Sequence, residues 1–135
     1  MIQIIMGLKG SGKTKKLIDS INQAVASAQG DVVCIEYGNN LRYEVTSRAR
    51  LVSSKEYGIE NLDMLKGFLS GLHAGNYDIT NVYIDNLYKT IGTDRAAGEE
   101  FLLWCAKFAQ INNMEITITV SDDAALASEE IKDFL

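Results

Sequence analysis

Apolar residues along the chain follow two different spacings, which predict a regular alternation of strands and helices. Short apolar runs are typical of buried strands, and apolar residues three or four positions apart are typical of helices with one buried face. The runs predict strands at residues 2–6, 32–36, 50–53, 81–85 and 115–120. The helical spacing predicts helices at residues 14–28, 59–72, about 96–111 and 124–135. Because strands that alternate with helices usually form parallel sheets covered on both faces, we expect a three-layer α/β/α fold with about four or five strands.

Length and charge narrow the classes of protein that this fold can represent. The 135 residues are enough for one domain and too few for two, so residues 1–135 are expected to form a single domain. Thirteen basic and 18 acidic residues give a net charge of −5. Binding to nucleic acid without sequence preference needs clustered Lys and Arg, so this net charge argues against a nucleic-acid partner. A protein with this net charge can still carry local basic patches.

The amino-terminal segment and the cysteines indicate where the protein resides. The longest apolar runs are far shorter than the ~20 residues needed to cross a bilayer, so no membrane association is expected. Met1 leads directly into an apolar run without a basic segment or a cleavage site, so we expect no signal peptide. Cys34 and Cys105 fall at apolar positions and are expected to be small buried side chains, not nucleophiles. These features predict a cytoplasmic protein.

A glycine-rich motif lies between the first strand and the first helix. It matches the pattern G-x-x-x-x-G-K-[ST] and reads Gly7, Leu8, Lys9, Gly10, Ser11, Gly12, Lys13, Thr14. Glycines allow successive backbone N–H groups to turn inward and surround anionic oxygens, and the helix that follows adds its positive end. Lys13 can then contact the β- and γ-phosphates of a nucleotide, and the Thr14 hydroxyl can bind Mg²⁺.

These residues resemble the P-loop NTPase superfamily, and the resemblance extends from Met1 through the strand at residues 115–120. In that superfamily an aspartate at the tip of a second strand, the Walker B strand, holds the Mg²⁺ shell, and Asp85 matches it. In the branch with RecA-like ATPases and thymidine-kinase-like enzymes, another strand lies between these two and ends in a small polar residue facing the γ-phosphate. The resemblance implies this role for Ser121, or for Thr119. The alternative for Ser121 is that it caps a helix.

The residue after Asp85 departs from the pattern of that branch. Many members have a glutamate there that activates water, whereas this chain has Asn86, which cannot accept the proton. In RecA-like proteins the glutamate instead ends the strand after the first helix, and Glu36 occupies the matching place. Two hypotheses follow: Glu36 is the catalytic base, or the domain has no base and binds nucleotide with little turnover.

Arginines and tyrosines suggest further contacts. Arg42, Arg48 and Arg50 lie in or beside a polar stretch that could bind a phosphate acceptor, and Arg95 could reach a phosphate or remain a solvated charge. The order of elements also looks like that of thymidine-kinase-like enzymes, but the zinc-binding cysteine pairs of that family are missing. Among the tyrosines, Tyr37 or Tyr43 could stack on a nucleobase. No guanine-reading N-K-x-D motif occurs, which favours ATP over GTP.

The sequence therefore predicts binding of ATP, or GTP, together with Mg²⁺. Residues 7–14 and Ser121 would bind the nucleotide, Thr14 and Asp85 the metal, and Lys13 and Glu36 would be catalytic. The first hypothesis is hydrolysis coupled to a protein partner or a homo-oligomer. The alternatives are a small phosphotransferase of the nucleoside- or nucleotide-kinase type and a nucleotide-sensing module with little or no hydrolysis.

Overall fold

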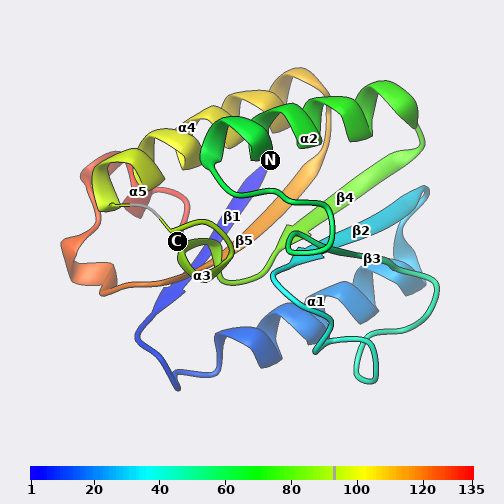
Figure 1. The fold of residues 1–135 in the computed structure, drawn as a ribbon, viewed down its shortest axis with the longest axis horizontal. Helices are drawn as coiled ribbons and strands as arrows, with labels where there is room; N and C mark the ends of the chain where they lie inside the picture. Colours follow the sequence, from blue (N-terminus) through cyan, green and yellow to red (C-terminus); the bar gives the residue numbers. More distant parts are fainter. Residues whose placement is uncertain (93) are drawn as a thin grey trace.

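Five parallel strands form the centre of the computed structural model, which describes residues 1–92 and 94–135 (Figure 1). In sequence order they are β1 (Ile2–Gly7), β2 (Asp31–Glu36), β3 (Arg50–Ser53), β4 (Ile79–Ile84) and β5 (Glu115–Ser121). Their order across the sheet is β1-β5-β4-β2-β3, and every neighbouring pair is parallel. The five strands expected from the apolar runs are confirmed.

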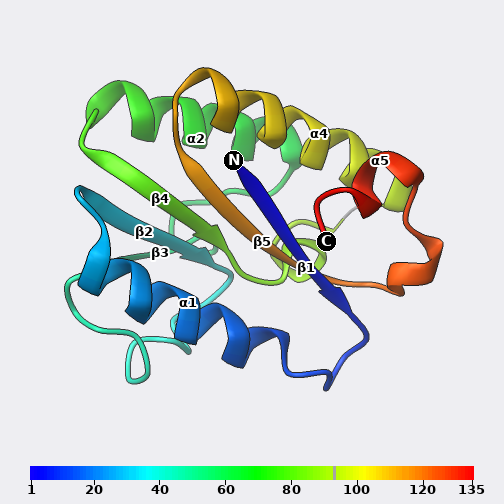
Figure 2. The same ribbon diagram turned by 180° about the vertical axis from the view of Figure 1, so that it is seen from behind.

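Helices cover both faces of this sheet, which confirms the three-layer α/β/α fold. Helix α1 (Lys13–Ser27) lies on one face, and α2 (Leu62–Gly75) and α4 (Arg95–Ile111) lie on the other (Figures 1 and 2). The shorter helical segments are α3 (Leu87–Thr90), the 3₁₀ turn η1 (Ala124–Leu126) and α5 (Glu129–Lys132). None of the described helices combines the length and the apolar character needed to span a membrane.

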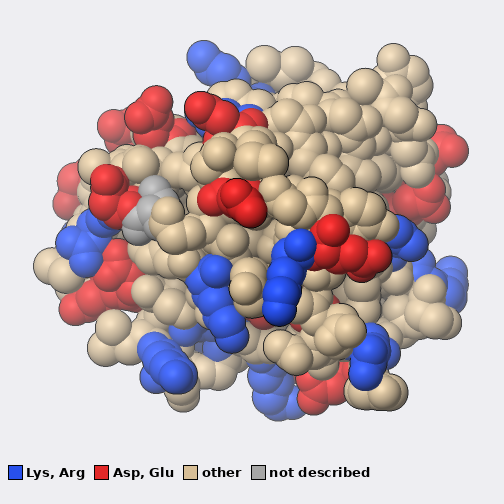
Figure 3. All heavy atoms as spheres, in the orientation of Figure 1, with Lys and Arg blue, Asp and Glu red and all other residues tan. Residues whose placement is uncertain are grey.

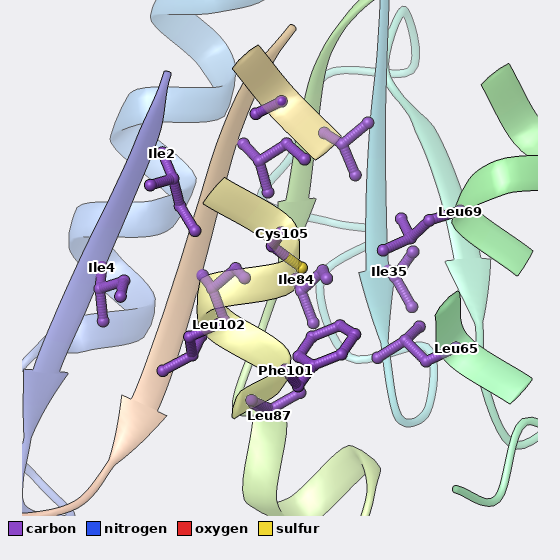
Figure 4. Close-up of a cluster of buried hydrophobic side chains, with 14 of the residues drawn as sticks. Ile2, Ile4, Ile35, Leu65, Leu69, Ile84, Leu87, Phe101, Leu102 and Cys105 are labelled. Atoms are coloured by element: carbon purple, nitrogen blue, oxygen red, sulfur yellow. The ribbon is translucent and has the colours of Figure 1, made fainter. Parts of the chain in front are cut away.

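The buried side chains divide into two cores, one on each face of the sheet. The larger core packs Leu65 of α2 and Phe101 and Leu102 of α4 against the strands (Figure 4). The smaller core packs Leu17 and Ile21 of α1 against the other face. Burying one side chain of this size contributes roughly 1.5–3 kcal/mol to the free energy of unfolding. The two cores therefore hold the strands, and with them the strand ends, in place.

The two cysteines follow this division of the core. Cys34 belongs to the smaller core and Cys105 to the larger, and both are free and buried. Burial raises the pKa of both thiols far above the ordinary value. A thiol with a raised pKa carries little thiolate and is a poor nucleophile, which agrees with the expected structural role.

The sheet order brings four strand ends to one side of the sheet, and three of them carry polar side chains. Strand β5 lies between β1 and β4, and its last residue, Ser121, pairs with Gly7 at the end of β1. Asp85 directly follows β4, and Glu36 ends β2. Parallel strands place their carboxyl ends on the same side of the sheet, where ligands of open α/β folds usually bind. This topology is compatible with a P-loop-like fold.

The structure corrects one helix start by three residues. The spacing predicts a helix at residues 59–72, but α2 begins at Leu62. Asn61 is its N-cap, because the Asn61 side-chain oxygen accepts a hydrogen bond from the Met64 N–H at 2.8 Å. Ile59 precedes the helix and is buried in the larger core. Its apolar side chain fits the helical spacing by coincidence, which is why the spacing predicts a helix start that is three residues too early.

The expected helix at residues 124–135 is wrong as a continuous element. Asp123 caps the 3₁₀ turn η1, and Ser128 caps the four-residue helix α5, so the backbone bends twice within this segment. The chain then turns toward the sheet, and the Phe134 carbonyl accepts a hydrogen bond from the Ile4 N–H at 2.9 Å. The carboxyl-terminal residues therefore cover part of the free edge of β1.

Candidate functional site

The loop between β1 and α1 has the backbone that the glycine motif predicts. Gly10 and Gly12 have φ angles of 86° and 85°, in the left-handed region that residues with a Cβ rarely adopt. Between them, the Ser11 N–H donates to the Leu8 carbonyl at 3.1 Å and closes a tight turn. Gly12 is the N-cap of α1, and no side chain in the described part of the chain caps this helix end. The first N–H groups of α1 thus keep their capacity to bind an anion.

A hollow of about 370 Å³ lies over this loop. The loop side is formed by Lys9, Gly10, Gly12, Lys13, Thr14 and Lys15. The side formed by the sheet consists of Asn86, Thr119 and Ser121. Among the residues that the structure describes, three lysines and no carboxylate line this hollow, so its lining favours an anionic ligand.

Lys13 is buried at the start of α1, and its ammonium group points back to the loop. Lys13 Nζ donates to the Leu8 carbonyl at 3.1 Å. A lysine in this position has two more N–H donors available for an anion in the hollow. Leu8 itself is exposed and contributes its carbonyl, not its side chain, to this arrangement.

Asp85 lies beside this hollow and joins the loop to the sheet. Its Oδ1 atom accepts hydrogen bonds from the Thr119 hydroxyl at 2.8 Å and from the Thr14 hydroxyl at 3.5 Å. Thr119 comes from β5, which lies beside the Asp85 strand in the sheet. The hydroxyl of Thr14 and the carboxylate of Asp85 therefore meet at the edge of the lysine-lined hollow.

These two oxygens suit a magnesium ion that takes most of its ligands from elsewhere. Mg²⁺ is usually held by one or two protein oxygens, with water and phosphate oxygens completing six ligands. Within the described residues, no group of three or more His, Cys, Asp and Glu side chains is placed to hold a metal ion. The donor set of Thr14 and Asp85 thus fits Mg²⁺ bound together with phosphate.

Asn86 directs the chain away from the tip of β4 in a left-handed conformation, with φ 52°. Its N–H donates to the Thr119 hydroxyl at 2.6 Å, and its side-chain oxygen accepts from the Ser121 hydroxyl at 3.2 Å. Asparagine adopts this conformation more readily than most residues. The Asn86 side chain thus stabilises the turn after the strand.

Glu36 lies in a second hollow, of about 180 Å³, that shares Thr14 and Asn86 with the first. Asp85 and Lys89 also line this second hollow. The site residues expected from the sequence thus form two adjoining groups, one around the glycine loop and one around Glu36, joined by Thr14.

The Glu36 carboxylate is buried and organises the loop that follows β2. Only 4% of the residue is exposed. Its two oxygens accept hydrogen bonds from the backbone N–H groups of Asn40, at 2.9 Å, and Leu41, at 3.3 Å. Burial raises the pKa of Glu36, the two N–H groups oppose that rise, and the negative charge of Asp85 adds to it. A carboxyl with a raised pKa is a stronger base than an ordinary glutamate.

Arg95 is engaged elsewhere on the surface. Its guanidinium group makes two hydrogen bonds to the Asp122 carboxylate, from Nε at 2.7 Å and from Nη2 at 2.8 Å. This bidentate pair joins the start of α4 to the residue after β5. The Arg95 guanidinium is thus held in a surface ion pair, a contact that neither of its two expected roles includes.

Sequence reasoning named most of this constellation but left the role of Thr119 open. Thr119 contacts both Asp85 and the Asn86 N–H, whereas Ser121 contacts the Asn86 side chain. The alternation of Thr117, Thr119 and Ser121 along one strand signals polar side chains on one face, but it does not reveal which of them meets Asp85. No protein-family model matches this chain, and no curated protein matches it either.

The variant Thr119→Val is expected to lower the free energy of unfolding by about 1–3 kcal/mol. Valine has nearly the shape of threonine but leaves the Asn86 N–H and Asp85 without their hydroxyl partner, and an unpaired buried group costs about this much. Urea denaturation measures the change. Thr119→Ser keeps the hydroxyl and is the matched control. A Val variant as stable as the unchanged protein would show that the Thr119 hydroxyl does not support the turn.

Proposed function

We propose that this chain binds a nucleoside triphosphate, preferably ATP, together with Mg²⁺, as a minimal P-loop NTPase of the RecA-like and thymidine-kinase-like branch. One observation carries the proposal. The glycine loop, three lysines and the N-terminus of α1 surround a hollow, and Thr14 on its loop side meets the Asp85 carboxylate just outside it. This combination of anion donors and two hard oxygen ligands is what a magnesium triphosphate requires.

Each group has a distinct task in this proposal. The loop N–H groups and Lys13 hold the β- and γ-phosphates, and Thr14 and Asp85 hold the metal. Thr119 keeps Asp85 in place, and Ser121 faces the same hollow. Bound Mg²⁺ would neutralise negative charge that builds on the phosphate oxygens during transfer.

Hydrolysis would follow with Glu36 as the base. A water molecule in the second hollow attacks the γ-phosphorus, and the Glu36 carboxylate accepts the proton that the water loses. The bond between the γ-phosphorus and the bridging oxygen breaks, and the nucleoside diphosphate leaves with that oxygen. Turnover coupled to a protein partner or to a homo-oligomer is the form of this activity that we propose.

Titration calorimetry tests the binding step. With ATP and Mg²⁺ we expect saturable heat at one site, and removal of Mg²⁺ by a chelator should weaken binding because the phosphates lose a counter-charge. GTP under the same conditions should bind more weakly. Phosphate release is then measured with and without added nucleosides. Release that requires an added acceptor would favour a phosphotransferase, and binding without release would favour a sensing module. No heat and no shift in melting temperature would overturn the proposal.

A further inference from the structure

Three exposed tyrosines, each beside a basic side chain, occur within residues 37–57. The Arg42 guanidinium lies 4.8 Å from the centre of the Tyr43 ring, and the Lys55 ammonium lies 5.9 Å from the Tyr37 ring. Arg50 donates to the Tyr57 hydroxyl at 3.5 Å. The three residues Tyr43, Tyr57 and Tyr37 are 84%, 52% and 41% exposed. We call this surface, formed by the three tyrosines with Arg42, Arg50 and Lys55, the tyrosine–arginine surface.

The backbone beneath the Arg42–Tyr43 pair is fixed. Leu41 and Val45 are buried in the smaller core, which turns Arg42 and Tyr43 outward. The Asn22 side chain on α1 donates to the Glu44 carbonyl at 3.1 Å and accepts from the Thr46 N–H at 3.0 Å. An aromatic ring held on a fixed loop loses little conformational entropy when a flat ligand stacks on it.

Residues 54–58 link the other two pairs to the same strand ends. The Lys55 N–H donates to the Tyr37 carbonyl at 3.1 Å, and the Ser53 hydroxyl donates to that same carbonyl at 3.0 Å. Tyr37 also lines the second hollow, beside Glu36. Two of the three pairs, Tyr37–Lys55 and Arg50–Tyr57, therefore lie along β3, and the Arg42–Tyr43 pair lies in the loop between β2 and β3.

Charge is distributed unevenly over the chain. Residues 1–58 contain eight Lys and Arg and five Asp and Glu, whereas residues 59–135 contain five and thirteen. In space, Lys and Arg side chains spread over the lower part of the face in Figure 3, and Asp and Glu gather mainly above and to the left. Residues 37–57, which carry the tyrosine–arginine surface, contain four Lys and Arg and two Asp and Glu, so this segment has a charge of +2 in a chain with a net charge of −5.

We propose that the tyrosine–arginine surface binds single-stranded nucleic acid. Unpaired bases stack on aromatic faces, and the phosphates that link them pair with Arg and Lys, so the ligand needs rings and cations in alternation. An acidic protein partner would pair with the Arg and Lys side chains but would not need to contact the tyrosine rings. A lipid bilayer would call for large apolar side chains at the surface, and tyrosines paired with cations do not supply them. The proposal does not depend on nucleotide binding at the glycine loop.

Fluorescence anisotropy with labelled dT and U oligonucleotides of about 15 residues tests the proposal, in the absence of ATP. We expect saturable binding that weakens steeply as salt rises, because phosphate contacts release counterions. Tyr43→Ala should weaken binding about tenfold, the loss expected for one stacked base. Tyr77→Ala is the matched control, because Tyr77 is 81% exposed but lies between α2 and β4 at the other end of the sheet.

Further variants separate stacking from simple charge attraction. Arg42→Gln should weaken binding and reduce its salt dependence, whereas Lys107→Gln on α4 should do neither. Lys13→Ala should bind the oligonucleotides as the unchanged protein does, which separates this surface from the glycine loop. Equal losses in Tyr43→Ala and Tyr77→Ala would overturn the proposal. Failure to bind either oligonucleotide at low salt would also overturn it, as would equally tight binding of polyglutamate.

Discussion

Replacing Lys13 with alanine is expected to weaken MgATP binding about 100-fold. Lys13 is a buried residue at the start of α1, and the Leu8 carbonyl takes only one of the three N–H donors of its ammonium group. Hydrogen bonds to charged groups contribute about 1.5–3 kcal/mol each. At the lower value, the loss of contacts to two phosphates costs about 3 kcal/mol, which corresponds to a factor of about 100. Titration calorimetry measures the dissociation constant of each protein.

Lys16→Ala provides the control for this change in charge. Lys16 lies one turn further along α1, is exposed and does not line the hollow over the loop. Its removal changes the net charge equally and should alter ATP affinity less than about threefold, because solvent and salt screen exposed charges. Equal losses in the two variants would mean that the overall charge of the region, and not the loop, attracts the nucleotide.

The parts of the site that the sequence predicts are those that depend on local chain geometry. The positive φ angles of Gly10 and Gly12 follow from a motif of eight consecutive residues. The meeting of Thr14, Asp85 and Glu36 follows from a general property of parallel sheets, whose carboxyl ends share one edge. Neither inference requires knowledge of which strand lies beside which.

The remaining contacts depend on the order of strands and could not be read from spacing. Thr119 meets Asp85 because β5 lies directly beside β4, although the two residues are 34 positions apart in the chain. The expected carboxyl-terminal helix failed for a different reason. Ser128 starts a new helix by capping it, and an apolar spacing that continues past such a cap does not show that the backbone changes direction.

The last prediction concerns Glu36. If Glu36 is the base, Glu36→Gln should lower the rate of phosphate release by a factor of about 10²–10⁴, the usual contribution of a general base, and leave MgATP affinity nearly unchanged. Gln keeps the size of the side chain but cannot take up the proton of water at neutral pH. Single-turnover phosphate release measures the rate, and calorimetry measures the affinity.

The pH dependence gives an independent check on the same residue. Burial raises the pKa of Glu36, so the rate of the unchanged protein should fall on acidification at a higher pH than for an ordinary glutamate. The folded state also holds this proton more tightly than the unfolded chain does. The free energy of unfolding should therefore fall as pH rises from the ordinary glutamate pKa to the raised pKa of Glu36. The Glu36→Gln variant should not show this fall, because glutamine does not ionise.

A purely structural Glu36 would give a different pair of results. Its carboxylate accepts the N–H groups of Asn40 and Leu41, and Gln retains one oxygen to accept one of them. If Glu36 only organises this loop, Glu36→Gln should lower the melting temperature without a selective loss of phosphate release. The Asn40 contact can be tested by hydrogen exchange of its N–H. Slow turnover with this N–H still protected would assign the loss to proton transfer, because the loop would remain in place while the base was gone.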